Sequence, residues 1–196
     1  MTDSIILLKN VRLAFPQLWT PKAMSGNDGK PGKPKYSATF LFAPDHPSFA
    51  ELKAVVLAVA KAKWADKADA ILKGLKAQDK LCYHDGVTKS QYSGFEGNFF
   101  VSANSDNRPS VFDRTKTPLA EADGKPYAGC YVNASIDVWA QDSAQWGKRI
   151  NAQLRGVQFV RDGDAFAAGT AASEDEFEDL GDQGDGESAD DTDPLA

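Results

Sequence analysis

Residues 130–141 read CYVNASIDVWAQ, a run in which small or aliphatic side chains alternate with polar or aromatic ones. Such a period of two is typical of a β-strand with one buried and one solvated face. Residues 149–160 alternate in the same way until Gly156, where the pattern shifts by one residue, as a glycine bulge would explain. We expect two long strands whose inner faces carry Cys130, Val132, Ala134, Ile136, Val138 and Ala140, and Ile150, Ala152, Leu154, Val157 and Phe159.

The sequence on either side of these runs predicts shorter strands and two helices. Strands are expected at residues 5–15, 36–42, 98–103 and 110–112, the first with Ile5, Leu7, Val11, Leu13 and Phe15 in one alternating set and Pro16 as its end. Asp45 and Pro47 predict the cap and first turn of a helix, and a second helix is expected at residues 66–77. This order, without an internal repeat, predicts an α+β domain built on an antiparallel barrel.

Charge divides the chain into a basic body and an acidic end. Residues 173–196 contain eleven Asp or Glu and no Lys or Arg, whereas residues 1–172 hold 22 basic and 17 acidic side chains. We therefore predict a folded domain over residues 1–172 and a disordered acidic tail over residues 173–196. A basic body with a tethered polyanion indicates a protein that binds single-stranded nucleic acid, and a tail that only aids solubility is the alternative.

The composition also limits cofactors and location. Cys82 and Cys130 form no paired motif, and His46 and His84 have no zinc-ligand spacing, so we expect no disulfide, metal site or cofactor. No apolar run approaches the length of a membrane span and no signal peptide is recognisable, so a cytoplasmic protein without a membrane partner is expected. A homo-oligomer is left open.

Candidate binding residues combine aromatic rings with cations, because bases stack on rings while cations follow the phosphates. They come from a Pro-, Gly- and Lys-rich loop at residues 16–35, from a Gly-rich segment near residue 94, and from the solvated face of the two long strands. Packing under loops is the alternative for each aromatic residue. The candidates are Trp19, Lys22, Lys30, Lys33, Lys35, Tyr36, Tyr92, Phe95, Arg108, Tyr131, Trp139, Arg149 and Arg155.

A catalytic site has weaker support. A Mg²⁺-dependent nuclease needs two or three convergent carboxylates and often a lysine, for which the candidates are His84, Asp85, Glu96, Asp106, Asp113 and Lys116. Their spacing does not require them to converge, and several are typical of turns or strand ends. We predict that the protein is not an enzyme.

Several segments together resemble a phage and prophage family of single-stranded-DNA-binding proteins, from Leu8 to about Phe166. The resemblance implies an OB-like barrel and a role in phage replication or recombination, in the cytoplasm of the host cell. The matching segments are Lys9-Asn10-Val11-Arg12 with Ala14-Phe15-Pro16, Tyr36-Ser37-Ala38-Thr39-Phe40, Tyr92-x-Gly94 to Ser102-Ala103 with Arg108-Pro109, Tyr127-x-Gly129-Cys130-Tyr131-Val132, and Gly156-Val157-Gln158 to Arg161-Asp162-Gly163.

The tail resembles, more loosely, those of single-strand binders that dock on partner proteins through an acidic end with a proline and a terminal hydrophobe. Here the end is Asp-Pro-Leu-Ala without a terminal aromatic residue. The expected partner-binding residues are Phe177, Leu180, Pro194 and Leu195.

The sequence thus predicts an OB-like barrel that coats and protects single-stranded DNA without strong sequence preference. Its tail is expected to recruit replication or recombination proteins. A DNA-mimic interaction protein that inhibits a basic enzyme, and a nuclease, are the alternatives.

Overall fold

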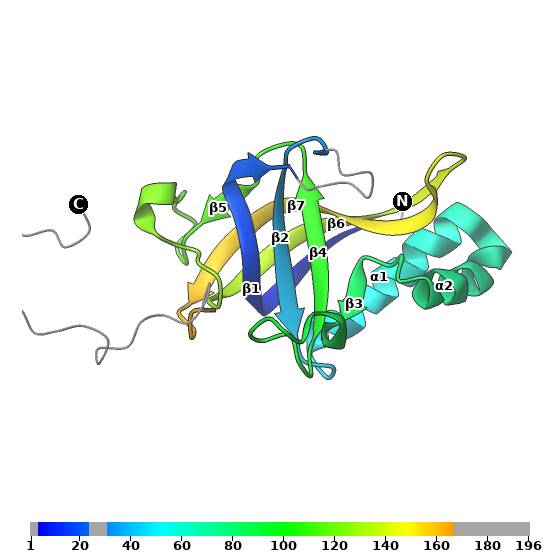
Figure 1. The fold of residues 1–196 in the computed structure, drawn as a ribbon, viewed down its shortest axis with the longest axis horizontal. Helices are drawn as coiled ribbons and strands as arrows, with labels where there is room; N and C mark the ends of the chain where they lie inside the picture. The colour runs from blue at the N-terminus through cyan, green and yellow to red at the C-terminus, as the bar shows by residue number, and fades with distance from the viewer. Residues whose placement is uncertain (1–3, 24–30, 167–196) are drawn as a thin grey trace, which may run out of the picture. The chain divides into compact units, whose positions relative to one another are not determined.

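The computed structural model describes residues 4–23 and 31–166, which belong to one compact unit. Figure 1 shows strands curved around a core, with two helices beside them. The strands are β1 (Ile5–Lys22), β2 (Lys35–Phe42), β3 (Tyr83–Asp85), β4 (Phe99–Ser105), β5 (Ser110–Phe112), β6 (Tyr131–Ser143) and β7 (Gly147–Arg161). The helices are α1 (Pro47–Trp64) and α2 (Ala68–Ala77), joined by a 3₁₀ turn, Ala65–Lys67. The expected sites Lys30, Phe177, Leu180, Pro194 and Leu195, and the whole tail, lie outside the described residues.

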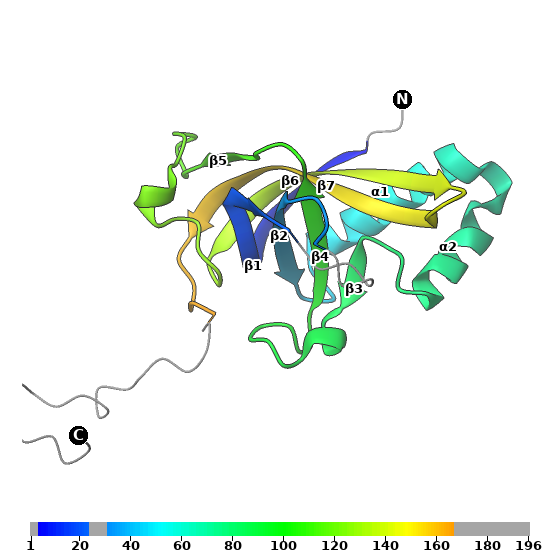
Figure 2. The same cartoon turned by 45° about the horizontal axis from the view of Figure 1, so that its top comes forward.

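Five strands close into a barrel in the order β1, β2, β4, β7, β6 and back to β1 (Figures 1 and 2). All neighbours are antiparallel except β4 and β7, which meet in parallel at Asn104 and Gln153. This connectivity, with α1 and α2 inserted between β2 and β3, is OB-like. The expected α+β fold with an OB-like barrel and inserted helices is confirmed. β3 and β5 extend the sheet beyond the barrel, beside β4 and β7.

The register of β6 and β7 follows the sequence pattern. Leu154 is paired with Ile136, but Gly156 is paired with Ser135, so one extra residue of β7 is accommodated between them. The predicted glycine bulge is therefore confirmed, and it keeps Leu154 and Val157 both buried in the core. The inner set of β6 from Val132 to Val138 is fully buried, as expected.

β1 differs from its prediction in both length and phase. It runs past Pro16 to Lys22, because the ladder with β2 is irregular between Ala14 and Gln17, where an N–H donor is not required. The pairing with β6 also shifts between Leu8 and Val11, next to Asn10 with its φ of 51°. Two irregularities in one strand therefore change which side chains face the core. Ile6, Leu8, Val11, Leu13 and Leu18 are buried, whereas Ile5, Leu7 and Phe15 are exposed.

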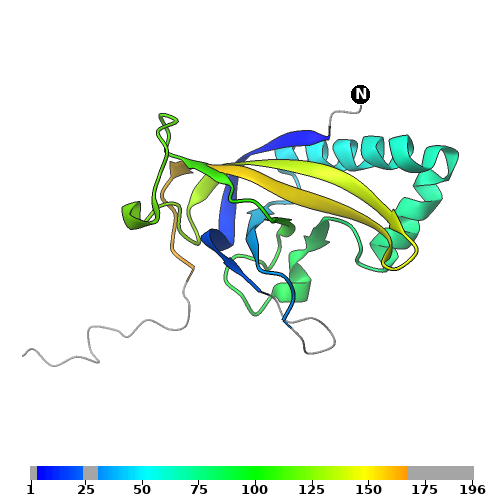
Figure 3. The same cartoon turned by 90° about the horizontal axis from the view of Figure 1, so that it is seen from above.

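The helices pack beside the β6–β7 hairpin where it extends beyond the barrel (Figures 1 and 3). Trp64 at the end of α1 donates its indole N–H to Asp142 on β6 at 2.8 Å. Lys148 contacts the same carboxylate at 2.9 Å, and both contacts hold the pKa of Asp142 below its ordinary value. The helices therefore brace the hairpin. The predicted cap of α1 was one residue early: His46, not Asp45, accepts a bond from the Ser48 amide. Within the described residues, no helix is long and apolar enough to cross a membrane.

Candidate nucleic-acid interface

The outer surface of β1, β2 and β4, here called the β1–β2–β4 face, has a floor of small polar side chains. Ser37 lies opposite Asn104, and Thr39 lies opposite Ser102 with their hydroxyl oxygens 3.3 Å apart. In OB folds the second and third barrel strands, here β2 and β4, form the surface on which oligonucleotides are bound. Short side chains on that surface let a strand approach the sheet closely.

One end of this face carries lysines. Lys22 is paired with Lys35 across β1 and β2, while Lys33 lies 3.0 Å and Lys35 3.8 Å from the carboxylate of Asp106. The hydrogen bond from Lys33 lowers the pKa of Asp106. At this end of the face, three exposed lysines therefore lie near a single carboxylate, that of Asp106. The sequence predicted a loop at residues 16–35, but Lys22 ends β1 and Lys35 begins β2, and the pairing of these strands brings Lys22, Lys33 and Lys35 together.

Trp19 and Arg108 lie together near the lysine end. The guanidinium carbon of Arg108 is 5.1 Å from the centre of the Trp19 ring, and Arg108 is exposed. Trp19 itself is half-buried and packs against the core, and Tyr36 is half-buried at the start of β2. Arg108 rather than Trp19 presents the larger open surface to a ligand.

The other end of the face carries aromatic rings. Phe15 and Tyr92 are 42% and 46% exposed, and their rings meet edge to face at 5.1 Å. Phe15 has a φ of 47°, and it turns out to solvent at the irregularity of β1. The ammonium of Lys89 lies 4.9 Å from the Phe100 ring, and burial lowers the pKa of Lys89. Sequence analysis placed Phe15 in the alternating apolar set of the first strand, not among the binding candidates, and overlooked Lys89, because both positions depend on tertiary packing.

Phe95 does not have the exposed position that base stacking needs. It is 1% exposed and forms a small cluster with Ala14, Leu41 and Phe100 on the outer surface of the sheet. The segment between β3 and β4 folds back over that surface and buries the ring. The Phe95 prediction is therefore corrected: the residue supports Phe15 and Tyr92 from below, at centroid distances of 5.6 and 6.1 Å.

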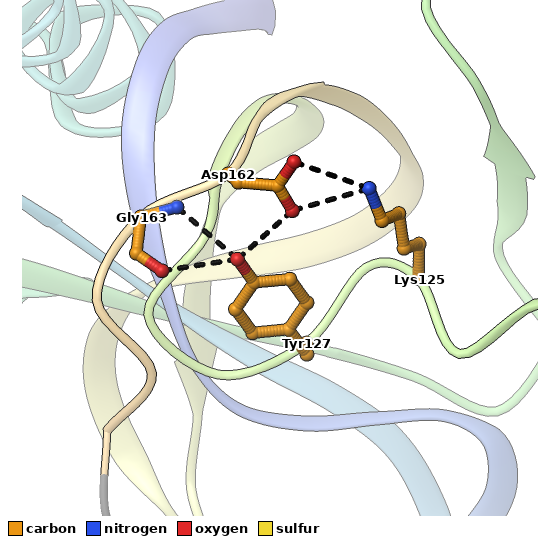
Figure 4. Close-up of polar contacts among 4 residues, drawn as sticks. All are labelled: Lys125, Tyr127, Asp162 and Gly163. Atoms are coloured by element: carbon orange, nitrogen blue, oxygen red, sulfur yellow. Dashed lines mark hydrogen bonds and ion pairs between the residues drawn. The ribbon is translucent and has the colours of Figure 1, made fainter.

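Residues 162–166, here called the C-terminal strap, leave β7 and lie against the aromatic end. The Tyr127 hydroxyl lies 3.0 Å from an Asp162 carboxylate oxygen and 3.0 Å from the Gly163 carbonyl oxygen, and Lys125 lies beside the same carboxylate (Figure 4). The bonds from Lys125 and Tyr127 lower the pKa of Asp162. Phe166 packs against the Phe95 cluster, and its amide donates to the Ala128 carbonyl at 3.0 Å. Gly129, with a φ of 103°, leaves no room for a Cβ beside the strap.

The outer surface of β6 and β7, here called the β6–β7 face, is also polar. Its amides bond to each other across the strands: Asn133 donates to Gln158 and Asn151 donates to Gln141, both at 3.1 Å. The predicted residues on this face are dispersed. Trp139 is 44% exposed, Arg149 and Arg155 are exposed, and Tyr131 is half-buried with the Arg161 guanidinium carbon 3.4 Å from its ring centre.

Trp146 lies in the turn between β6 and β7 and is 70% exposed. Its amide donates to the Ser143 hydroxyl at 3.0 Å, and Gly147 follows with a φ of 70°. The corresponding loop of OB folds contributes to oligonucleotide binding. Sequence analysis missed Trp146, although a tryptophan beside a glycine between two long strands could have indicated an exposed hairpin tip.

The carboxylates considered for catalysis have local structural roles. Asp85 caps the turn at Val87, Asp106 pairs with the lysines, and Asp113 accepts bonds from Thr115 and Thr117. His84 lies 2.6 Å from Asp79 instead of joining these residues. The described residues contain no group of three or more His, Cys, Asp or Glu side chains suited to a metal ion. Burial raises the pKa of Cys82 to about 12 and of Cys130 to about 11, so both thiols are protonated at neutral pH.

The chain is similar in sequence to proteins of bacteriophages. Residues 4–191 match the model of a family described as the ssDNA-binding protein of Enterobacter phage Enc34. The chain belongs to this family. It is also 43% identical over 178 residues to protein p50 of Acyrthosiphon pisum secondary endosymbiont phage 1, covering 89% of this chain and 93% of p50.

Solved structures agree with the family assignment. The single-stranded DNA-binding protein from bacteriophage Enc34 in complex with ssDNA is 30% identical, with a TM-score of 0.68 over 84% of this chain and 90% of that chain. The single-stranded DNA-binding protein gp2.5 of bacteriophage T7 is 13% identical, with a TM-score of 0.53 over 91% of this chain and 99% of that chain. The gp2.5 likeness shows a shared fold. The phage-family resemblance read from the sequence is thus confirmed.

Proposed function

We propose that this protein binds single-stranded DNA along the β1–β2–β4 face, without strong sequence preference. The observation that carries the proposal is the placement of cations and exposed rings at the two ends of one open sheet surface, in a member of a phage ssDNA-binding family. The Enc34 protein, which is 30% identical to this chain, has a solved structure in complex with ssDNA, and this supports the same ligand here.

The charges support a backbone-binding mode. Among the described residues, all five ion pairs use a lysine or a histidine, so none of the six arginines lies within 4 Å of a carboxylate. Unpaired cations attract phosphates irrespective of base, and exposed rings favour strands whose bases are unstacked. The Phe15 and Tyr92 pair supplies such rings. Arg108 supplies a cation without an ion pair among the described residues, and Lys22 and Lys33 add positive charge at the lysine end.

Titration with unlabelled single-stranded and duplex oligonucleotides tests this function, with intrinsic tryptophan fluorescence as the signal. If the strand neutralises about 4 to 6 cations, log K falls with log salt at a slope of roughly −3 to −4. Single strands are expected to bind more tightly than duplex. Equal affinity for both, or affinity that is independent of salt, would contradict the proposal.

The cellular role we propose is to coat and protect ssDNA in phage replication or recombination in the host cytoplasm, and to recruit partner proteins through residues 173–196. The sequence supports a second role for this segment, since eleven tethered negative charges compete with DNA phosphates for the same cations. Deleting residues 173–196 is expected to tighten ssDNA binding, most clearly at low salt, and to abolish capture of replication or recombination proteins. Unchanged affinity at low salt would reject the competition, and surviving capture would move the docking site to the barrel.

We further propose that this role is non-enzymatic. The local bonds of Asp85, Asp106 and Asp113 support this, because each carboxylate already serves a turn or an ion pair. Incubation of labelled DNA with the protein and Mg²⁺ tests it on a gel, and cleavage that depends on protein and metal would favour the nuclease alternative. The five net positive charges of residues 1–172 oppose a DNA mimic, which needs acid on its folded surface.

A further inference from the structure

A cavity of about 320 Å³ with a mixed polar and apolar lining lies at the end of the β1–β2–β4 face remote from the lysines, next to the aromatic end. It shares Leu41 with the Phe95 cluster, and Arg12 lies directly opposite Leu41 across β1 and β2. No acidic side chain lines this cavity. Its lining consists of Asn10, Arg12, Leu41, Phe42, Ala43, His46, Asn98 and Tyr131.

Arg12 is held rigidly but is not neutralised. Its Nε donates to the Gly129 carbonyl at 3.2 Å and its Nη2 donates to the Asp164 carbonyl at 2.7 Å. Its guanidinium carbon also lies 4.3 Å from the centre of the Phe166 ring. These bonds engage two of the five N–H donors of the guanidinium, and carbonyl partners leave its full positive charge. The cation is therefore pre-positioned at the cavity with donors to spare.

A second guanidinium lies close by. Arg161 and Arg12 are both placed against Tyr131, with guanidinium carbons 3.4 and 5.6 Å from its ring centre. Arg161 also donates from Nε to the side-chain oxygen of Asn10 at 3.4 Å. Two cations near one ring repel each other, and the described residues place no carboxylate within 4 Å of either to offset this repulsion. An anionic ligand would relieve this repulsion.

The remaining lining suits an anion with some apolar surface. His46 accepts the Ser48 amide at Nδ1, so the ring proton of the neutral imidazole is on Nε2 and available for donation. Leu41, Phe42 and Ala43 keep part of the lining apolar, and charge-assisted hydrogen bonds are stronger where water is partly excluded.

We propose that this cavity binds one backbone phosphate of the DNA strand, with Arg12 as its main ligand and Arg161 as the supporting cation. The inference rests on the proposed function and extends it. Cations then hold the strand at both ends of the β1–β2–β4 face: the lysines at one end, and the arginines at the other, next to the Phe15–Tyr92 pair. From Lys35 to Leu41 the distance along β2 is about 20 Å, enough for several nucleotides.

The test compares Arg12→Gln with Arg12→Lys. Both substitutions lose the forked bonds to the Gly129 and Asp164 carbonyls, but only the glutamine removes the charge. Salt-dependent ssDNA titrations of the full chain are expected to give Arg12→Gln a slope shallower by about 0.7, the contribution of one phosphate, while Arg12→Lys keeps the wild-type slope. Arg114→Gln, at an exposed arginine that follows β5, is the charge-matched control and leaves the slope unchanged.

Equal slopes for the two Arg12 variants would overturn the phosphate site while leaving ssDNA binding intact. If wild-type protein itself shows no salt-dependent preference for single strands, the proposed function fails instead. If thermal melting shows that Arg12→Gln is unfolded at the assay temperature, Arg161→Gln is measured in its place. The salt slope of Arg161→Gln is expected to be shallower than that of the wild type by the same amount. Oligonucleotides with and without a 5′-phosphate show whether the bound phosphate is internal or terminal. If Arg12→Gln loses affinity only for the phosphorylated strand, the cavity binds a strand end and the proposed internal phosphate is overturned.

Discussion

The β1–β2–β4 face and the β6–β7 face are both solvated surfaces of one barrel, but they use their polar side chains differently. On the first, short hydroxyl and amide side chains cover the middle and charged or aromatic groups gather at the two ends. On the second, long amides bond to each other, and Arg149, Arg155 and Trp139 stand apart. Beside it, β1 exposes the apolar side chains of Ile5 and Leu7, which offer nothing to a phosphate.

This difference shows that an alternating pattern identifies a solvated surface but not a ligand-binding one. A polyanion needs cations that are close together and not satisfied by neighbours, because the attraction of isolated exposed charges is screened within about 10 Å at moderate salt. Arg12 and Arg161 at the cavity meet this condition, and the lysine end places Lys22, Lys33 and Lys35 around a single carboxylate, that of Asp106. The β6–β7 face does so less well, although its individual residue types are suitable.

The largest expected effect comes from the exposed rings. Replacing Phe15 and Tyr92 together with alanine should cost about 1 to 3 kcal/mol of ssDNA binding for each ring that stacks on a base. Both side chains are already half in solvent, so the fold should persist. Fluorescence titration measures the loss, and Trp139→Ala serves as the control from the other face. If Trp139→Ala loses more binding free energy than the double variant, the β6–β7 face rather than the β1–β2–β4 face is the main binding surface.

A smaller effect is expected at the lysine end. The double substitution Lys33→Gln and Lys35→Gln should make the salt slope shallower by about 0.7 for each phosphate that the variant no longer neutralises. The matched pair on the β6–β7 face is Arg149→Gln with Arg155→Gln, which removes the same charge. If both pairs lower the slope equally, the two faces contribute alike and the distinction between them fails.

Trp146 tests whether the hairpin tip joins the β1–β2–β4 face in binding. Because OB folds use this loop and the ring is 70% exposed, Trp146→Ala should weaken ssDNA binding by about 1 kcal/mol, the lower end for a stacking ring. Its melting temperature should match that of the wild type. Unchanged affinity would restrict the interface to the sheet and its lysines.

The smallest effect is expected from Asp106→Asn, which frees Lys33 and Lys35. Binding should tighten slightly, most clearly at low salt, where the released cations are least screened. Because Lys33 lowers the pKa of Asp106, the carboxylate stays charged from about pH 5 to 8 and is neutralised only as pH falls through that lowered value. Titration of the variant across pH 5 to 8 should therefore run parallel to the wild type, and weaker binding would mean that Asp106 positions the lysines rather than competing for them.

Strands with regular patterns could be predicted from the sequence. β6 and β7 follow a period of two, and Gly156 marks the shift inside the ladder; a second shift lies at its end, between Tyr131 and Val132. The helical spacing of apolar residues likewise predicts α1 and α2. β1 could not be phased in this way, because its irregularities at Asn10 and Phe15 depend on pairing with two different strands, β6 and then β2.

The candidate site was predictable in part. A lysine-rich loop stands out in composition, and neighbours in sequence remain neighbours in space at Lys33 and Lys35. The aromatic end joins Phe15 to Tyr92, far apart in sequence, and Phe95 is buried by the folding of its own segment. No local pattern reports such packing, so the sequence alone puts Phe15 in the apolar set of a strand and Phe95 among the binding candidates.

Photo-crosslinking tests the central claim most directly, namely that DNA lies on the β1–β2–β4 face. A dT oligonucleotide with a single 5-iodouracil is bound to the full chain, irradiated, and its peptide adducts are mapped by mass spectrometry. Adducts are expected at Phe15 and Tyr92, with Trp19 next in yield. Adducts confined to Trp139 and its neighbours on the β6–β7 face would contradict the claim.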